Sequence, residues 1–152
     1  MNVFVTAVVV SHDADEFFAI TARSLAAQTR TPDRILVIDT SEKVDNLDVK
    51  GLSEKLGFEY LKLAPTTSLQ GSLEAAAEGM AGKNQWLWLL HDDSAPDPNA
   101  LAEILAAIEA SPSVALAGPK LVRWQQPRII TQLGLTLTPY GAPFSPVDEQ
   151  FD

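Results

Sequence analysis

Two adjacent carboxylates, Asp92 and Asp93, follow a run of large apolar residues in the segment WLWLLHDDSAPDP, residues 86–98. Such a run is typical of a buried strand. Adjacent side chains of a continuing strand point to opposite faces, so we expect the two carboxylates to do different work. One could ligate Mg²⁺ or Mn²⁺, which favour oxygen ligands, while the other accepts a hydrogen bond from a hydroxyl. The alternative is that Asp93 caps the turn through Ser94 and that Asp92 is simply solvated.

Three other positions could contribute to the same kind of site. Asp39 ends an apolar run, where an ionised carboxylate is costly unless it is solvated or paired. It could accept a hydrogen bond from a base N–H or a ribose hydroxyl, or it could cap a turn. His12 could ligate a metal, although a single histidine beside a serine and an aspartate is more often a loop hydrogen-bonder. Gly71 could let the backbone approach a phosphate at a helix start, which is a weak signal on its own.

Apolar runs alternate along the chain with segments of helical spacing. The runs that predict strands cover residues 5–11, 34–41, 58–63, 85–91 and 113–120. The segments that favour helices cover residues 15–29, 47–57, 68–81 and 97–111. Residues 128–139 alternate well enough for one strand or a hairpin. This order predicts an α/β fold with a mostly parallel sheet and right-handed crossovers.

Local signals predict where the helices begin and end. Asp13, with Glu16 three residues on, resembles a capping box ahead of the first helix. Gly57 is expected to stop the second helix, because glycine readily adopts the left-handed conformation found at helix ends. Asp97 can cap the fourth helix, and Pro98 suits its first turn.

Ligands of open parallel α/β sheets bind outside the carboxyl ends of the strands. This rule selects the polar residues that follow the first, second and fourth predicted strands, namely Ser11, His12, Asp13, Asp39, His91, Asp92 and Asp93. The sequence therefore predicts that these residues share one edge of the sheet.

Composition excludes several classes of function. The chain has 152 residues, 46% of them hydrophobic, which is typical of one soluble globular domain. A formal net charge of −9 argues against nucleic acid or an anionic membrane as a partner, since both need clustered Lys and Arg. The absence of cysteine excludes a disulfide framework, a thiol nucleophile and a thiolate metal site. The N-terminal apolar run lacks the flanks of a secretory signal and is far shorter than the roughly 20 residues of a membrane helix, so we expect a cytoplasmic protein without a transmembrane segment.

Taken in order, VTAVVVSHD, ILVIDTS, the helix start that contains Gly71 and WLWLLHDDSAPDPNAL resemble the N-terminal half of a family 2 glycosyltransferase. The resemblance spans about residues 3–122 and is closest to actinobacterial members that act on cell-envelope or surface polysaccharides. It implies the GT-A fold, a Rossmann-like, mostly parallel sheet sandwiched by helices. Residues 1–138 would form the nucleotide-sugar-binding half, and residues 139–152 a proline-rich extended tail or the start of the acceptor half.

The resemblance also implies an activity and its partners. The enzyme would be inverting, would use a nucleotide-diphosphate sugar, UDP-linked, as donor and would transfer the sugar to a glycan or lipid-linked acceptor. It would act in the cytoplasm, including the inner face of the membrane. The cofactor would be Mg²⁺ or Mn²⁺.

Family roles carry over to individual residues by similarity. Asp39 would accept the N3–H of uracil, and Val10 and Ser11 would line the pocket for base and ribose. Asp92 would contact the ribose or the donor sugar, and Asp93 would ligate the metal that bridges the two phosphates. Gly71, at its helix start, joins the nucleotide- or sugar-binding residues.

Two features depart from the family pattern. His91 stands where the family frequently has the first aspartate of its acidic motif. The carboxylate that acts as general base lies in the second half of the family domain, which places it beyond Asp152. Glu149 and Asp148 follow a proline-rich stretch without a family pattern and are not assigned this role. We therefore expect a donor-binding fragment of a longer, truncated domain that is inactive in transfer by itself.

Two alternatives come from other classes of protein. A non-catalytic assembly or regulatory α/β module would expose apolar surface and form a homo-oligomer. A receiver-like phosphoacceptor domain has a similar size, and the GPK at residues 118–120 resembles its lysine signature. The acidic pair of a receiver follows the first strand, however, whereas the pair in this chain follows the fourth. A dinucleotide-dependent oxidoreductase is disfavoured because no G-x-G-x-x-G follows the first strand.

Overall fold

The structure of the chain is a computed structural model that describes most of its residues. The described ranges are residues 3–13, 16–43, 47–78, 80, 84–111, 113–134, 136–147 and 149–152. The chain divides into two compact units, Met1–Ala102 and Glu103–Asp152, and the helix at residues 100–109 runs across the division. The functional boundary predicted at residue 138 stays a prediction. Within the described residues, no helix has the length and apolar character needed to span a membrane.

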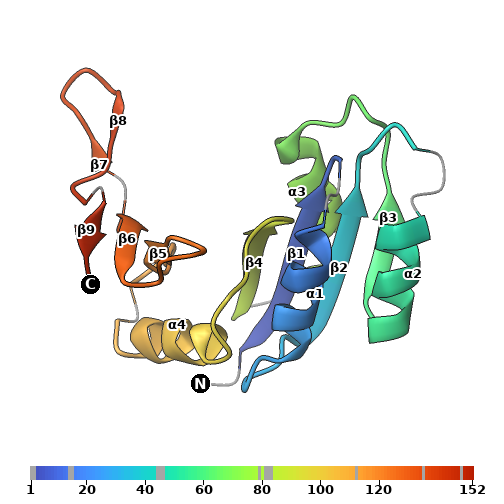
Figure 1. Ribbon diagram of the computed structural model, residues 1–152, viewed down its shortest axis with the longest axis horizontal. Coiled ribbons are helices and arrows are strands. Elements are labelled where there is room, and N and C mark those ends of the chain that lie inside the picture. Colours follow the sequence, from blue (N-terminus) through green and yellow to red (C-terminus); the bar gives the residue numbers. More distant parts are fainter. Residues whose placement is uncertain are drawn as a thin grey trace. The chain divides into compact units, whose positions relative to one another are not determined.

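The first unit contains a single parallel sheet. Its elements are β1 (Phe4–Ser11), α1 (Phe18–Ala26), β2 (Arg34–Asp39), α2 (Leu47–Leu56), β3 (Glu59–Lys62), α3 (Leu69–Ala77) and β4 (Gln85–His91). The strands lie in the order β3-β2-β1-β4, and all three pairings are parallel (Figure 1). The predicted α/β fold with a parallel sheet is therefore confirmed.

Helices cover both faces of this sheet (Figure 1). On one face, Phe18 of α1 and Val49 of α2 pack with Val9 and Val37 of the two central strands. On the other face, Ala76 of α3 packs with a second group from the same strands. The continuous apolar runs of β1 and β2 follow from this arrangement, because a strand that is covered on both faces needs apolar residues at every position.

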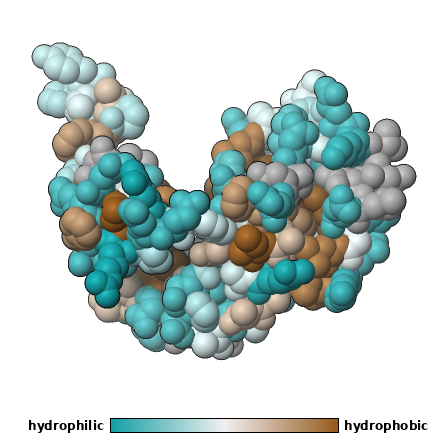
Figure 2. All heavy atoms as spheres, in the orientation of Figure 1, coloured by the Kyte–Doolittle hydropathy of each residue, from teal (hydrophilic) through white to brown (hydrophobic). Residues whose placement is uncertain are grey.

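Large apolar side chains also reach the surface of the first unit. They are Phe4, Ile20, Leu69, Leu87 and Leu89. Hydrophobic colour at the surface is visible in Figure 2 on the part of the molecule that contains the sheet. Leu87 and Leu89 belong to β4, which forms one edge of the sheet.

The ends of α1 and α2 differ in how well the sequence predicted them. The capping box expected at Asp13 and Glu16 is wrong, because α1 begins at Phe18 with Phe17 at its N-cap and no capping side chain. Gly57 does end α2, with a φ of +76°. Its N–H donates to Glu54 and the next N–H donates to the Ser53 carbonyl, which is the hydrogen-bond pattern of a glycine-terminated helix.

The later helices agree better with the sequence. Ser68 caps α3, as its side-chain oxygen accepts a hydrogen bond from the Gly71 N–H. The structure ends α3 at Ala77, so this helix is shorter than the predicted range of residues 68–81, of which residues 79 and 81 lie outside the described residues. Asp97 opens the turn before α4 (Ala100–Glu109), where its Oδ1 accepts a 2.9 Å hydrogen bond from the Asn99 N–H.

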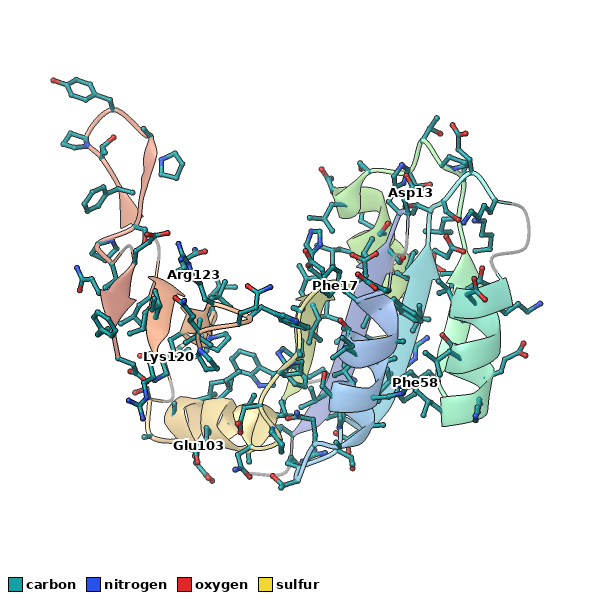
Figure 3. All side chains as sticks on the ribbon, viewed as in Figure 1. Asp13, Phe17, Phe58, Glu103, Lys120 and Arg123 are labelled. Carbon is teal, nitrogen blue, oxygen red and sulfur yellow. The ribbon has the colours of Figure 1, made fainter. Side chains whose placement is uncertain are left out.

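The second unit contains short antiparallel pairings. Its strands are β5 (Leu121–Val122), β6 (Ile129–Gln132), β7 (Thr136–Leu137), β8 (Pro143–Phe144) and β9 (Gln150–Phe151). One sheet has the order β5-β6-β9, and β7 pairs with β8. Two side-chain ion pairs, Lys120 with Asp152 and Arg123 with Glu149, join the C-terminal residues of this unit to β5 and its flanks. Figure 3 labels the two cations, Lys120 and Arg123.

Two strand predictions in this unit are wrong. Residues 113–120 are all described and contain no strand. Leu116 is 93% exposed, so the segment does not bury its apolar side chain. Pro119 has no N–H to donate to a neighbouring strand, so a strand here would lack one hydrogen bond of its ladder. Residues 128–139 form neither one strand nor a hairpin, because β6 and β7 belong to different sheets. The tail from residue 139 contains the short strands β8 and β9, and the two alternatives given for it stay predictions.

Candidate functional site

The four parallel strands end in one row at the carboxyl edge of the sheet. Ser11 at the end of β1 is in register with Asp39 at the end of β2, and Asp39 is in register with Lys62 at the end of β3. On the other side of β1, Val10 is in register with His91. Figure 3 labels Asp13 at this end of the sheet. The structure therefore brings together the strand-end residues that the sequence selected.

Asp39 is the fully buried carboxylate of this row, beside the equally buried Ser11. Its Oδ1 accepts a 2.8 Å hydrogen bond from the Ser41 backbone N–H and lies 3.2 Å from Lys62 Nζ. Its Oδ2 accepts a 2.8 Å hydrogen bond from Tyr60 Oη. Lys62 Nζ also donates to the Ser41 carbonyl at 2.7 Å and to Ser41 Oγ at 3.0 Å. A buried carboxylate is thus held by two residues of β3 and by the turn after β2.

These contacts decide the charge of Asp39. Burial raises the pKa of this carboxyl, because a low dielectric disfavours the charged form. The hydrogen bonds from Ser41, Tyr60 and Lys62 lower it by more, so the pKa of Asp39 lies below its usual value. Asp39 is therefore an ionised hydrogen-bond acceptor at neutral pH.

The residues after β1 form the neighbouring part of the edge. The Ser11 side chain is buried, and its Oγ has no hydrogen-bond partner within the described part of the chain. The Ser11 carbonyl accepts hydrogen bonds from the N–H and Oγ1 of Thr40. His12 Nδ1 lies 3.0 Å from the same Thr40 Oγ1, in agreement with the loop hydrogen-bonding interpretation of this histidine. Asp13 is exposed.

The acidic turn after β4 gathers three groups that could hold a metal ion. His91 Nδ1 lies 3.6 Å from Asp92 Oδ1 and 3.5 Å from Asp93 Oδ1. The three ligand atoms all lie within 4.8 Å of one another. The side chains of His91, Asp92 and Asp93 are 81%, 19% and 64% exposed, so the pair of carboxylates has one inner and one outer member. Two carboxylate oxygens beside an imidazole fit Mg²⁺ or Mn²⁺.

The turn itself is closed without the side chain of Asp93. The N–H and Oγ of Ser94 donate to the His91 carbonyl at 3.3 and 2.7 Å. Ser94 therefore supplies the local turn contact, and the alternative in which Asp93 caps this turn through Ser94 loses its support. The carboxylate of Asp93 is exposed, and its role as a metal ligand stays a prediction.

Helix α1 and the residues that follow it anchor the acidic turn and the loop after that turn, which the sequence did not predict. Thr21 Oγ1 donates a 2.9 Å hydrogen bond to the Asp92 carbonyl. Gln28 is buried, and its side-chain NH₂ donates to the Asp97 carbonyl at 2.7 Å. Its Oε1 accepts a 3.1 Å hydrogen bond from the Leu101 N–H. Thr21 lies on the buried side of the amphipathic helix α1, whereas Gln28 follows the end of that helix at Ala26. A polar residue on the apolar face of a helix is the one sequence signal that could have identified Thr21.

The glycine expected to approach a phosphate lies at the N-terminus of α3. The Gly71 N–H donates a 3.1 Å hydrogen bond to Ser68 Oγ, so this amide already serves the helix cap. A Cβ at Gly71 would lie 3.1 Å from Thr67 Cγ2. A packing reason for glycine therefore exists at this position, and its role toward a ligand stays a prediction.

Comparison with known sequences identifies a family and a curated relative. The sequence pattern of glycosyl transferase family 2 matches residues 6–140, which is most of the chain. The galactofuranosyltransferase GlfT1 of Mycobacterium tuberculosis is 33% identical over 117 residues. The match covers 72% of this chain and 37% of GlfT1, so the chain spans little more than a third of that relative.

Comparison with solved structures supports the same fold. Residues 1–349 of TarS of S. aureus, in complex with UDP-GlcNAc, match with a TM-score of 0.59 and 16% identity, over 81% of this chain and 38% of that fragment. A glucosyl-3-phosphoglycerate synthase from Mycobacterium tuberculosis, solved with Mn²⁺ and UDP, matches with a TM-score of 0.54 and 12% identity. That match covers 72% of this chain and 40% of the synthase. The fold is therefore GT-A-like, and by its sequence pattern the chain belongs to glycosyl transferase family 2.

Proposed function

We propose that the chain is the donor-binding part of an inverting glycosyltransferase that uses a UDP-linked sugar. The observation that carries this proposal is the row at the carboxyl edge of the sheet, where the buried, ionised Asp39 and the acidic turn at residues 91–93 both end strands of one parallel sheet. A base-binding acceptor and a phosphate-binding metal site are the two functions that a nucleotide diphosphate requires. Membership of the family supports this reading over a receiver-like phosphoacceptor.

Asp39 is proposed to recognise the base. Uracil carries a hydrogen on N3, and an ionised carboxylate can only accept hydrogen bonds. Oδ2 of Asp39 receives one hydrogen bond from Tyr60, which leaves acceptor capacity on this oxygen for the N3–H. Val10 and Ser11 on the neighbouring strand are proposed to line the base and ribose pocket. Ser11 Oγ has no hydrogen-bond partner among the described residues, which supports a ligand contact there.

The acidic turn is proposed to hold the diphosphate through Mg²⁺ or Mn²⁺. Asp93 would be the carboxylate ligand, and Asp92 would contact the ribose or the donor sugar. The bound metal would supply positive charge that stabilises the leaving diphosphate. The contributions of the chain itself are the two carboxylates and the backbone anchor from Thr21 that fixes the position of the turn.

The acceptor and the product follow from the resemblance to actinobacterial members and from the similarity to GlfT1, which is named as a galactofuranosyltransferase. We propose a glycan or lipid-linked acceptor, and a role in building a cell-envelope or surface polysaccharide in the cytoplasm, including the inner face of the membrane. The base that activates the acceptor hydroxyl is proposed to lie outside this chain, which would then bind the donor without completing transfer.

The surface of β4 supports a proposal about assembly. β4 is an edge strand, and its Leu87 and Leu89 are exposed. Exposed apolar side chains on an open strand edge favour association with another surface. We propose that the isolated chain forms a homo-oligomer through this edge, which size-exclusion chromatography with light scattering would detect. A monomer at all concentrations would contradict this proposal.

The test of the donor proposal is thermal unfolding of the full chain with UDP, with and without Mn²⁺, and with ADP as the control nucleotide. At a free ligand concentration of about 100 times Kd, binding adds about 2.7 kcal/mol, or roughly 5 to 10 °C for a domain of this size. We expect a Mn²⁺-dependent increase in Tm that is larger for UDP than for ADP. The proposal is wrong if UDP causes no shift, or if ADP causes the same shift as UDP.

A further inference from the structure

Two ion pairs join β2 to β3, one at each end of the strands. At the amino end, Arg34 Nη2 lies 2.7 Å from Glu59 Oε2, and both side chains reach solvent. At the carboxyl end, Lys62 Nζ lies 3.2 Å from Oδ1 of the buried Asp39. The two cations are equally exposed, at 28% each, so the pairs differ mainly in the burial of the carboxylate. An exposed ion pair contributes little to the stability of the fold. A buried carboxylate, in contrast, is strongly destabilising when its cationic partner is removed.

Lys62 is committed to this cluster by its geometry. An ammonium group has three N–H donors, and Nζ of Lys62 has three acceptors at 2.7, 3.0 and 3.2 Å. These acceptors are the carbonyl and Oγ of Ser41 and Oδ1 of Asp39. Lys62 is therefore arranged to hold the turn after β2 and the carboxylate together, and not to contact a ligand directly.

Tyr60 fixes the other oxygen of the same carboxylate. Its Oη donates to Oδ2 of Asp39 at 2.8 Å, while Oδ1 is held by the Ser41 N–H and by Lys62. A carboxylate with directed donors on both oxygens cannot rotate freely, and these donors favour its charged form. Tyr60 and Lys62 both come from β3, two residues apart and on the same face of the strand.

We propose that Tyr60 and Lys62 are positioning residues that keep Asp39 a fixed, ionised acceptor and thereby set the preference for uracil over cytosine. The inference rests on the proposed function, in which Asp39 accepts the N3–H of the base. Cytosine has a hydrogen-bond acceptor at N3, which would face the carboxylate of Asp39, itself an acceptor, without a hydrogen between them. Loss of either β3 donor would let the carboxyl group rotate or bind a proton, and a protonated carboxyl can donate to cytosine N3. The selectivity between the bases should therefore fall.

The experiment compares Kd for UDP and CDP by isothermal titration calorimetry with Mn²⁺ present, using the full chain. The variants are Tyr60→Phe, Lys62→Met and Lys62→Arg, with Arg34→Met as the matched control at the other end of the same strands. We expect Tyr60→Phe and Lys62→Met to lower the ratio of the CDP to the UDP Kd by about tenfold, because each removes a hydrogen bond to a charged group. Lys62→Arg should retain part of the selectivity, and Arg34→Met should match the wild type within about twofold.

The ratio of the CDP Kd to the UDP Kd distinguishes a positioning effect from a folding effect. A general loss of folded protein would weaken the binding of both nucleotides equally and leave this ratio unchanged. Circular dichroism accompanies each titration, and if Lys62→Met unfolds, Tyr60→Phe decides the result because it removes only a hydroxyl. An unchanged ratio in a folded Tyr60→Phe variant would overturn the inference while leaving the donor proposal intact. An equal loss in Arg34→Met would also overturn it, since that side chain lines a separate pocket at the amino end of the sheet. Failure of the wild type to bind UDP would instead contradict the proposed function, and the inference with it.

Discussion

Thr21 Oγ1 donates a 2.9 Å hydrogen bond to the main-chain carbonyl of Asp92, across 71 residues of sequence. Helix α1 packs on the sheet through Phe18 and Leu25, so this bond ties the acidic turn to a rigid part of the fold. The contact uses the backbone of Asp92 and leaves its carboxylate for other partners. A site of this kind is more precise when its supporting residues lie on packed helices and strands.

The first prediction concerns this anchor. Thr21→Val removes the hydroxyl at nearly constant volume and leaves the Asp92 carbonyl without this donor. We expect the free energy of unfolding to fall by about 1 kcal/mol and the affinity for UDP with Mn²⁺ to weaken by a few fold. Urea unfolding and calorimetry measure the two effects.

Ser24→Ala is the control on the same helix, because Ser24 Oγ donates within the helix to the Thr21 carbonyl and does not reach the turn. If Thr21→Val and Ser24→Ala change UDP affinity equally, the anchor has no specific effect on the site.

The second prediction concerns Gln28, which holds the loop between the acidic turn and α4. Gln28→Leu would leave the Asp97 carbonyl and the Leu101 N–H without the partners that they have in the structure. A buried polar group that loses its partner costs about 1–3 kcal/mol, so we expect a loss of this size in urea unfolding. Gln70→Leu, at an exposed position of α3, should change stability by less than about 0.5 kcal/mol. Equal effects of the two variants would show that the Gln28 contacts contribute nothing.

The third prediction separates His91 from the carboxylates beside it. The imidazole of His91 is mostly exposed. Mg²⁺ and Mn²⁺ favour oxygen ligands, which the two carboxylates of the turn can provide. We expect His91→Ala to keep UDP affinity in Mn²⁺ within about threefold of the wild type, well below a tenfold loss of 1.4 kcal/mol. A larger loss, measured by the same titration, would make His91 a principal metal ligand.

The fourth prediction concerns stability at acid pH. The pKa of Asp39 is lowered in the folded chain, and so are those of Asp33 and Glu59, the latter chiefly by its hydrogen bond from Arg34. Below about pH 4 the unfolded chain therefore binds more protons than the folded chain, and the free energy of unfolding falls as the pH decreases. Urea unfolding at about pH 7, 5, 4 and 3 should show a plateau followed by this loss.

The variant Asp39→Asn tests whether Asp39 contributes to this loss of stability at acid pH. It removes one of the groups with a lowered pKa, so the loss of stability between about pH 5 and pH 3 should be smaller than in the wild type. An equal slope in the two proteins would mean that Asp39 has the same pKa in the folded and unfolded chain.

The sheet and its carboxyl edge could be predicted from the sequence, because the continuous apolar runs of β1 and β2 identify strands that are covered on both faces. The run of β4 also predicted a buried strand, but in the structure β4 is an edge strand whose Leu87 and Leu89 are exposed. The end of each run then places Ser11, Asp39 and His91 at one edge without further information. Gly57 likewise marks the end of α2, since its effect is local.

The supporting contacts could not be predicted in the same way. In the sequence, Tyr60 and Lys62 are indistinguishable from other strand residues. Their contact with Asp39, which lies 21 residues before Tyr60, forms only when β2 and β3 pair. The role of Thr21 depends on its hydrogen bond to the Asp92 carbonyl, which lies 71 residues away in the sequence. The error at residues 113–120 has a similar origin, because an apolar run becomes a strand only where a neighbouring strand accepts its hydrogen bonds.

UDP is proposed to bind at the carboxyl edge of the sheet through a metal that Asp93 holds. The most direct measurement is calorimetric titration of UDP in Mn²⁺ into the wild type, Asp93→Ala and Glu54→Gln, a neutralising control at an exposed position of α2. We predict that Asp93→Ala loses UDP affinity by about tenfold or more at an unchanged Tm, while Glu54→Gln binds like the wild type. Equal affinity of Asp93→Ala and the wild type would contradict the account.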